Sequence, residues 1–499
     1  MPPTVKPPPV GPCSPPACTR YRYDVNSVAV KSRGNSCPPG TRLVRAGAIA
    51  FFAVILSWVI YAVLSGRSGA LDAVDLTVYR DGGLIVRHVQ PYYNPHAYAP
   101  LYDWGGYSSL ALKFTYPPFA AVVFAPLSIL PPRVMVTCSV VGNMIALVAA
   151  LWFTFGGLGY RDRRVRLGAT LVAAAVTFWL QPVVRTIYLG QVNLILMAMI
   201  MWDLCQADTT KDGKVRWWKG FATGIAAGIK LTPLIFIPYL LLTRKFRAAA
   251  GTVVGFLFSV AVGFLFLPHD SSQWWFHGLI WKDGSRAGFI AWAGNQSLHA
   301  LTSRLMGSVA AGQTSWILAS ALAFVGGMTA AYLLDRAGYQ VGAILVTALT
   351  GLLLSPISWD HHWVWIALAV AVTGHYAIVS GRRGVKSTAR WLWVLVGGMI
   401  LAFAAWPDAI FTSARNLGKF SLGWLWMQKN TNPILYSKYH DQAWYVEYHW
   451  HGCQLLWGNA YILSGMALLL VALFIGFRLR KSAPVAEEVA QPAVGAGVS

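Results

Sequence analysis

Three titratable side chains stand in a row at Asp360, His361 and His362, between two strongly apolar parts of the chain. Carboxylate and imidazole groups are the usual general bases and acids of enzymes, because they exchange protons near neutral pH. Neighbouring side chains point in different directions along a helix, so we expect at most one histidine to face a given pocket, preferably His361. The alternative role for Asp360 is a helix N-cap.

A second pair of carboxylates, Asp72 and Asp75, follows the first apolar segment. Their spacing of three residues places both on one face of a helix. Asp75 is our candidate for a general base that takes a proton from an attacking hydroxyl group. Its alternative role is a helix N-cap, where aspartate and its charge are favoured, and the two roles are compatible.

Three further polar residues lie in or beside apolar segments. Gln191 and Asn193 stand at the end of one segment, where they either cap helices or bind sugar hydroxyls. Lys230 lies inside another and needs a carboxylate, phosphate or carbonyl partner, because an unpaired buried cation is costly. The alternative for Lys230 is that its side chain extends to the inner membrane surface.

The composition places these residues in a membrane protein. Of 499 residues, 56% are hydrophobic and only 12% are charged. The net charge of +22 comes from short basic runs between apolar segments, as at 161–166 and 244–247, which is typical of topology signals and lipid headgroup contacts. We therefore predict membrane lipids as partners and no nucleic acid. No CxxC or other metal-ligand spacing is present, so neither a metal site nor a disulfide framework is predicted.

The elements that must position these side chains are membrane helices. A helix needs about 20 apolar residues to cross a bilayer. The sequence predicts an all-α, polytopic membrane bundle, with two short or re-entrant segments at 117–131 and 220–243. Lys230 and Pro233 break the second of these, and broken helices are tolerated in membranes where they line a cavity. About ten full spans are predicted, at 44–64, 134–156, 167–181, 190–205, 248–267, 314–334, 341–356, 363–380, 390–406 and 457–478.

The basic runs set the predicted orientation, because lysine and arginine stay on the cytoplasmic side. Cytoplasmic, disordered tails are expected at 1–41 and 482–499, with the membrane domain at 42–481 between them. The outer face then receives the Asp360–His362 turn and three large loops, 65–116, 268–313 and 407–456. These loops are rich in aromatic residues beside Asn, Gln and Asp. Such residues either anchor the protein at the membrane surface or bind sugars.

Several stretches together resemble glycosyltransferase family 87, a membrane family of the GT-C type, over roughly residues 44–475. A long N-terminus containing proline and cysteine departs from its shorter members. The resemblance is carried by Asp75 together with FTYPPFAAVVFAPLSIL (114–130), YLGQVNLILMAMIMWDL (188–204), GIAAGIKLTPLIFIPYLLLTRKFRAA (224–249), GNQSL (294–298) and SPISWDHHWVW (355–365).

This resemblance implies a polyprenyl-phosphate sugar as donor and a glycolipid as acceptor, in an actinobacterial plasma membrane. We expect mannose to be transferred in α-1,2 linkage, with inversion, to a phosphatidylinositol mannoside or to lipomannan or lipoarabinomannan on the periplasmic face. An arabinofuranosyltransferase using decaprenyl-phosphate arabinose is the alternative sugar specificity. A lipid or sugar transporter is the alternative of another class, and it would place polar residues at mid-membrane depth.

The implied mechanism assigns roles to the candidate residues. Asp75 is the expected base, and His361 or His362 orients the acceptor or stabilises the departing phosphate. No cofactor is expected, and no divalent metal, because a lipid monophosphate carries less charge than a nucleotide diphosphate. The residues expected to bind substrate are Asp72, Gln191, Asn193, Lys282, Arg286, Asn295, Gln296 and Asp360, of which Lys282, Arg286 and Asn295 hold the phosphate.

Overall fold

The protein is described from a computed structural model. Its described part consists of helices joined by turns and isolated bridges, which confirms an α-helical membrane protein there. The predicted tails and most of the loop 407–456 lie outside this part, so the division into domains stays a prediction. The described residues are 39–64, 71, 73–88, 101–102, 112–210, 212–278, 289–405 and 446–481.

Five helices in the described ranges are long and apolar enough to cross a membrane. A sixth crossing results if α7 (Gln181–Leu189) and α8 (Asn193–Leu204), which are bent by 115° at the break between them, span together. The five are α1 (Pro39–Leu64), α5 (Pro132–Gly157), α11 (Phe246–Phe266), α15 (Val309–Arg336) and α21 (Ala460–Lys481).

The predicted number of about ten full spans is not reached. The segments 167–181, 190–205 and 341–356 correspond to helices of 16, 12 and 15 residues, shorter than the roughly 20 that a bilayer core requires. Two further helices of 18 residues, α17 and α18, carry basic residues within their ends, which shortens their apolar part. These helices are α6 (Arg163–Phe178), α16 (Gln340–Leu354), α17 (Trp365–Arg382) and α18 (Lys386–Phe403).

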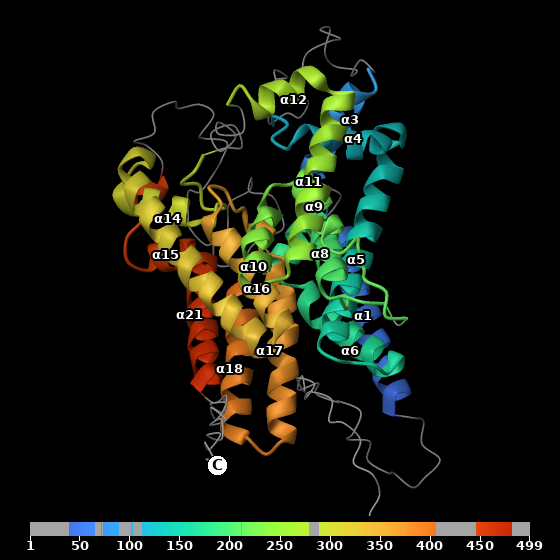
Figure 1. The fold of residues 1–499 in the computed structure, drawn as a ribbon, viewed down its shortest axis with the longest axis vertical. Helices are drawn as coiled ribbons and strands as arrows, with labels where there is room; N and C mark the ends of the chain where they lie inside the picture. The colour runs from blue at the N-terminus through green and yellow to red at the C-terminus, as the bar shows by residue number, and fades with distance from the viewer. Residues whose placement is uncertain are drawn as a thin grey trace, which may run out of the picture.

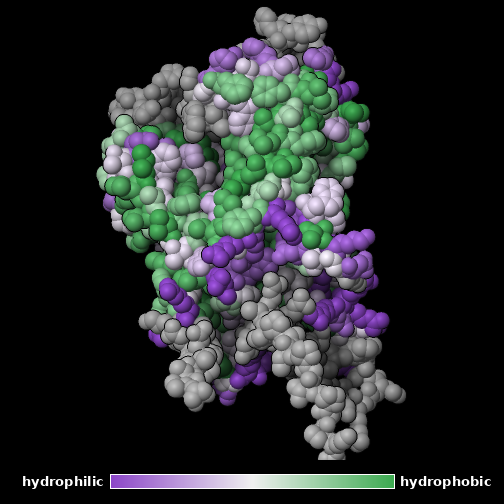
Figure 2. Space-filling view, viewed as in Figure 1, coloured by the Kyte–Doolittle hydropathy of each residue, from purple (hydrophilic) through white to green (hydrophobic). Residues whose placement is uncertain are grey.

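The helices form a bundle whose two ends differ (Figure 1). One end carries α3 (Val74–Val86), α4 (Pro118–Phe124) and α12 (Pro268–Trp275), and the C-terminal end of α21 points toward the opposite end. Between the ends, α1 packs on α6, α17 packs on α18, and α15 packs on α16, α21 and α14 (Leu298–Met306). Figure 2 shows hydrophobic surface over the middle of the molecule and hydrophilic residues gathered below it.

Helix α9 (Phe221–Ile229) lies against α11 with glycines at the contact. A Cβ atom at Gly224 would collide with the carbonyl oxygen of Thr252, and one at Gly255 would collide with that of Phe221. Small residues allow helix backbones to approach closely inside a membrane, where helix association depends on packing. The glycines therefore fix the position of α9, which ends at the candidate site.

The predicted break in the segment 220–243 is confirmed. Helix α9 ends at Ile229, Lys230 has extended backbone angles, and the chain resumes as η3 (Thr232–Ile235) and α10 (Phe236–Leu242). Pro233 contributes to the break, because it has no N–H group that could donate to the carbonyl of Ile229 and continue α9.

Asp81 on α3 gives a prediction about stability. Its side chain is buried, and burial raises its pKa from 3.8 to about 7, despite the nearby charge of Arg80. Between these two values the folded protein binds more protons than the unfolded chain, so the free energy of unfolding falls as pH rises through this window. At pH 8 the loss is at most about 4 kcal/mol, taking about 1.4 kcal/mol per pKa unit.

Replacing Asp81 with Asn removes the buried charge. In detergent, we expect the Asp81→Asn variant to melt several degrees above the wild type at pH 8, and the difference to disappear near pH 5. A difference in melting temperature that is the same at both pH values would contradict the assignment of a buried, high-pKa carboxyl group.

Candidate active site

Three interruptions of helical structure meet at one place. They lie between α7 and α8 at 190–192, between α9 and η3 at 230–231, and between α16 and α17 at 355–364. Asn193 joins them, because its Nδ2 donates to the backbone carbonyl of His361 at 2.9 Å and its Oδ1 accepts from Lys230 Nζ at 2.8 Å. Non-helical backbone inside a membrane protein is tolerated where it is buried in protein or lines a cavity.

Helix α3 brings Asp75 to this junction. The backbone N–H of Ala73 donates to the carbonyl of Tyr188 at 2.9 Å, which ties the start of α3 to the end of α7. At Gly190, with φ of +71°, a Cβ would lie 2.6 Å from Cβ of Leu76, so only glycine allows α3 this close. The N-cap of α3 is Ala73, without a side-chain cap, so the alternative role of Asp75 as an N-cap is wrong.

The Asp75 carboxylate accepts a hydrogen bond from the side-chain amide of Gln191, which in turn accepts hydrogen bonds from two tyrosine hydroxyls. Gln191 Nε2 donates to Asp75 Oδ2 at 2.7 Å. Gln191 Oε1 accepts from the hydroxyl of Tyr79 at 2.5 Å and from that of Tyr116 at 3.3 Å. Burial raises the pKa of Tyr79 well above its usual value, so its hydroxyl stays a donor. The amide of Gln191 is therefore oriented with its NH₂ group toward Asp75.

Asp360 and His361 form a buried pair. The Asp360 carboxylate accepts from Gln181 Nε2 at 2.5 Å, from the His361 backbone N–H at 2.8 Å and from His361 Nδ1 at 3.1 Å. The N-cap of the 3₁₀ helix η4 (Asp360–His362) is Trp359, without a side-chain cap, so the alternative role of Asp360 as an N-cap is wrong.

The charges around this pair determine the protonation and the tautomer of the His361 ring. Burial alone would raise the pKa of Asp360. The hydrogen bond from His361 and the charge of Arg185 outweigh burial and hold the pKa below its usual range. Arg185 Nε lies 3.9 Å from Asp360 Oδ2. Burial lowers the pKa of His361, against the opposing effect of Asp360. With Nδ1–H donating to Asp360, Nε2 carries a lone pair, and no described residue donates to it.

His362 faces the other way and meets a cation. Its Nε2 lies 2.9 Å from Lys230 Nζ, so the ammonium donates and the imidazole accepts. The rings of His361 and His362 stand edge to face, 4.7 Å apart, which agrees with the expectation that they point in different directions. The predicted carbonyl partner of Lys230 is confirmed in Asn193, and the alternative of a side chain reaching the membrane surface is wrong.

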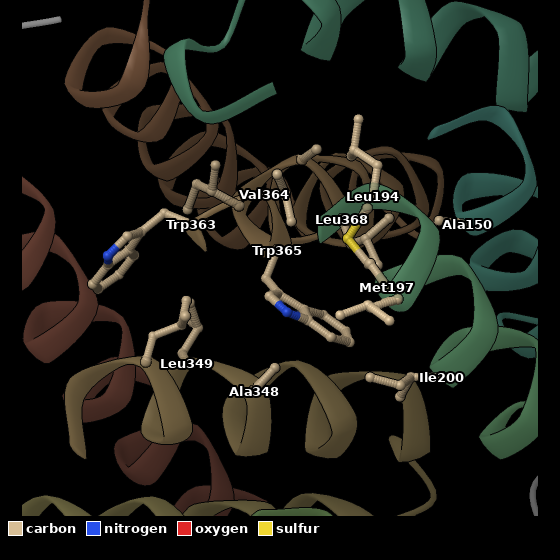
Figure 3. Close-up of a cluster of buried hydrophobic side chains, with 14 of the residues drawn as sticks. Ala150, Leu194, Met197, Ile200, Ala348, Leu349, Trp363, Val364, Trp365 and Leu368 are labelled. Carbon is tan, nitrogen blue, oxygen red and sulfur yellow. The ribbon is translucent and has the colours of Figure 1, made fainter. Parts of the chain in front are cut away.

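A pocket opens beside these polar groups. Asn193, Lys230 and His362 line its polar end. The preference for His361 as the histidine that faces the pocket is therefore wrong for this pocket, because His362 lines it and His361 does not. The rest of the wall is mainly apolar, apart from Thr232, and comes from α8, η3, α10, α16 and the start of α17. Figure 3 shows part of this wall, with Met197, Ile200, Ala348, Val364 and Trp365 among its side chains.

Asn295 and Gln296 are fully buried and bind backbone groups. Asn295 Nδ2 donates to the carbonyl of Ile290 at 2.9 Å, and its Oδ1 accepts from Ser358 N–H at 2.9 Å. Gln296 Nε2 donates to the carbonyl of Gly458 at 2.8 Å. These amides attach the turn that carries Asp360 to neighbouring loops. Their predicted role in substrate binding stays a prediction.

A buried arginine that the sequence did not single out supports the same loops. The guanidinium of Arg304 donates to the carbonyls of Ala291, Trp292 and Asn295 at 2.9, 2.7 and 2.6 Å, and also to the side chain of Asn459. Sequence reasoning also missed Gln181, Tyr79 and Tyr116. Of these, Tyr79 had a usable signal, because it follows Asp75 by four residues and so shares its helix face.

Asp72, Lys282 and Arg286 lie outside the described residues, so their predicted roles cannot be placed. Within the described ranges, no group of three or more His, Cys, Asp and Glu side chains could hold a metal ion. The arrangement offers a carboxylate oriented by an amide, a neutral imidazole with a free lone pair, and a cation beside an apolar pocket. Such groups can deprotonate a hydroxyl, orient it and bind an anion with a hydrocarbon tail.

Comparison with known proteins gives both a family and close relatives. The profile of Glycosyltransferase family 87 matches residues 114–356. The chain is 37% identical, over 59% of its length, to a protein of Mycobacterium tuberculosis (strain CDC 1551 / Oshkosh) named polyprenol-phosphate-mannose-dependent alpha-(1-2)-phosphatidylinositol pentamannoside mannosyltransferase. It is 31% identical, over 72% of its length, to a protein of the same name from Mycolicibacterium smegmatis (strain ATCC 700084 / mc(2)155).

A further relative is the polyprenol-phosphate-mannose-dependent alpha-(1-2)-phosphatidylinositol mannoside mannosyltransferase of Mycobacterium tuberculosis (strain ATCC 25618 / H37Rv), 33% identical over 53% of this chain. The matched regions cover 64% and 62% of the two M. tuberculosis proteins and 76% of the M. smegmatis protein. No solved structure gives a significant match.

Proposed function

Because the chain belongs to glycosyltransferase family 87, we propose that it transfers mannose from polyprenyl-phosphate mannose to a glycolipid acceptor. The names of its relatives support this donor and a phosphatidylinositol mannoside as acceptor, joined in α-1,2 linkage. The observation that carries the proposal is the contact between Gln191 Nε2 and Asp75 Oδ2, which presents an oriented carboxylate at the junction of the three helix breaks.

In the proposed reaction, the 2-hydroxyl group of the acceptor attacks the anomeric carbon of a β-linked donor. The bond from that carbon to the phosphate oxygen breaks on the opposite face, and polyprenyl phosphate leaves. Asp75 takes the proton of the attacking hydroxyl, so the product is α-linked with inversion. A positioned general base typically contributes a factor of about 10²–10⁴ to the rate.

His361 supports the attack without carrying charge. Its Nε2 lone pair accepts a hydrogen bond from a substrate hydroxyl, while Asp360 holds the ring by Nδ1. The scheme needs no metal ion, because a lipid monophosphate is a leaving group of low charge.

The proposed site faces the periplasm. Support comes from the basic runs at 161–166 and 244–247, which the positive-inside rule assigns to the cytoplasm, with Asp75 on the other side.

Competition between two donors tests the function. Purified protein in sealed vesicles is incubated with a mycobacterial phosphatidylinositol mannoside fraction and labelled decaprenyl-phosphate mannose, with or without unlabelled decaprenyl-phosphate arabinose. A parallel reaction carries the label on the arabinose donor instead. We expect labelled glycolipid from the mannose donor and little inhibition by the arabinose donor. Transfer of arabinose alone would establish the alternative sugar specificity. Movement of label across the membrane without a covalent product would establish a transporter.

Gln191 gives a separate prediction as a positioning residue. The Gln191→Leu variant loses the donor that orients Asp75, so we expect kcat to fall roughly 10- to 100-fold with little change in the KM for donor. Steady-state kinetics and a melting curve on the same preparation measure this. An increase in KM with unchanged kcat would instead assign Gln191 to binding sugar.

A further inference from the structure

We propose that Lys230, with Asn193 and His362, binds the phosphate of the lipid donor, and that the adjoining apolar pocket holds the first part of its isoprenoid chain. This inference rests on the proposed function and extends it, because it locates the leaving group. The three side chains line one end of the pocket and are linked by bonds of 2.8 and 2.9 Å from Lys230 Nζ.

The charge of Lys230 points to an anionic ligand. Its two hydrogen-bond partners, the amide of Asn193 and the imidazole of His362, are both neutral acceptors. Among the described residues, no carboxylate oxygen lies within 4 Å of the Lys230 ammonium group. Lys219 and Lys245 differ in this respect, because they form ion pairs with Asp208 and Asp335. Burial lowers the pKa of Lys230 to about 7, against the opposing charge of the more distant Asp75. A phosphate in direct contact would supply the close countercharge that favours the ammonium form.

The polar end of the pocket also has hydrogen-bond donors that are not yet used. An ammonium group has three N–H donors, and two of those of Lys230 are used. His362 is 8% exposed, and its Nδ1 is buried without a hydrogen-bond partner among the described residues. Thr232 lines the same pocket and brings a hydroxyl group. A phosphate has several acceptor oxygens and can bind more than one of these donors.

The remaining pocket wall fits a hydrocarbon. It consists mainly of aliphatic and aromatic side chains, including Leu196, Met197, Ile200, Phe236 and Trp365. Among the described lining residues, a nucleotide would find no second cation and few polar partners, whereas an isoprenoid chain buries apolar surface against such a wall.

The pocket also lies at the right place relative to the base. Lys230 Nζ is 5.9 Å from the centre of the Tyr116 ring, and the hydroxyl of that ring is 3.3 Å from Gln191, the residue that holds Asp75. A sugar attached to a phosphate at Lys230 would therefore lie next to the Asp75 network. The predicted phosphate ligand Asn295 lacks this position, because its amide group already binds backbone groups.

Binding of a lipid phosphate without sugar tests the inference. The full-length protein in nanodiscs is titrated with decaprenyl phosphate and with decaprenol, which lacks the phosphate. For Lys230→Met, we expect affinity for decaprenyl phosphate to fall about 10- to 100-fold, the value of one or two hydrogen bonds to a charged group, with decaprenol binding unchanged. Lys230→Arg should retain most of the affinity. The matched control is Lys214→Met, which changes an exposed lysine outside the site.

A second variant acts on the apolar wall. Ala348→Leu fills part of the pocket, so it should weaken decaprenyl phosphate and decaprenol together while leaving the lysine in place. If Lys230→Met and Ala348→Leu both fold and bind decaprenyl phosphate as the wild type does, the inference is overturned. If the wild type binds decaprenyl phosphate through Lys230 but transfers no mannose, the proposed function fails while the inference stands.

Discussion

Changing Asp75 to Asn is expected to lower the rate of mannosyl transfer by roughly 10²- to 10⁴-fold while the donor still binds. Asparagine has nearly the same shape, and its carbonyl oxygen can still accept from Gln191 Nε2, so the local geometry is retained. What is lost is the group that takes the proton from the attacking hydroxyl. Transfer is measured with labelled polyprenyl-phosphate mannose, and donor affinity by titration with the same compound.

The same helix provides a control for this change. Asp81→Asn replaces another carboxylate on α3, one that is buried away from the hydrogen bonds of Asp75, so its transfer rate should stay near that of the wild type. An Asp75→Asn variant with near-normal turnover and normal donor binding would remove Asp75 from the role of base.

The second large effect is expected at His361. His361→Ala should lower kcat about 100-fold and leave donor affinity nearly unchanged, because the lost imidazole orients the acceptor and does not line the pocket. Asp360→Asn should act in the same direction. An amide NH₂ facing Nδ1 favours the tautomer with the proton on Nε2, and the lone pair for the substrate is lost.

His362 and an exposed histidine make this assignment testable. His362→Ala should mainly weaken the donor, because its ring bonds to Lys230, and His451→Ala should change neither quantity. Steady-state kinetics and donor titration separate these outcomes when they are carried out on His361→Ala, Asp360→Asn, His362→Ala and His451→Ala. Equal, mild losses for His361→Ala and His362→Ala would instead indicate that the pair has a structural role.

The helices and one of the breaks could be read from the sequence because their causes are local. Long apolar segments and the pair Lys230–Pro233 gave the helical bundle and the break in 220–243. The bend between α7 and α8 was missed, since an apolar run containing Gly190, Gln191 and Asn193 resembles a membrane span with a polar end. The count of spans failed for a related reason: an apolar run does not reveal how much of it forms one helix.

The roles of the polar side chains depend on contacts that no local pattern contains. Asp75 and Asp360 both suggested N-caps, yet their carboxylates bind Gln191 and Gln181, which lie 116 and 179 residues away along the chain. Asn295 gives a third example, because its amide group binds the backbone of Ile290 and Ser358, and no local pattern indicates these contacts. In each case the distant partner decides the role, and it becomes known only from the fold.

The anomeric configuration of the product tests the central claim most directly. A single turnover by the purified protein with β-linked polyprenyl-phosphate mannose and a phosphatidylinositol mannoside gives a glycolipid whose new linkage can be read from its carbon–hydrogen coupling by nuclear magnetic resonance. Direct attack assisted by Asp75 predicts an α-mannoside. A β-mannoside, or the absence of any new mannoside while the protein binds its donor, would contradict the proposed single displacement.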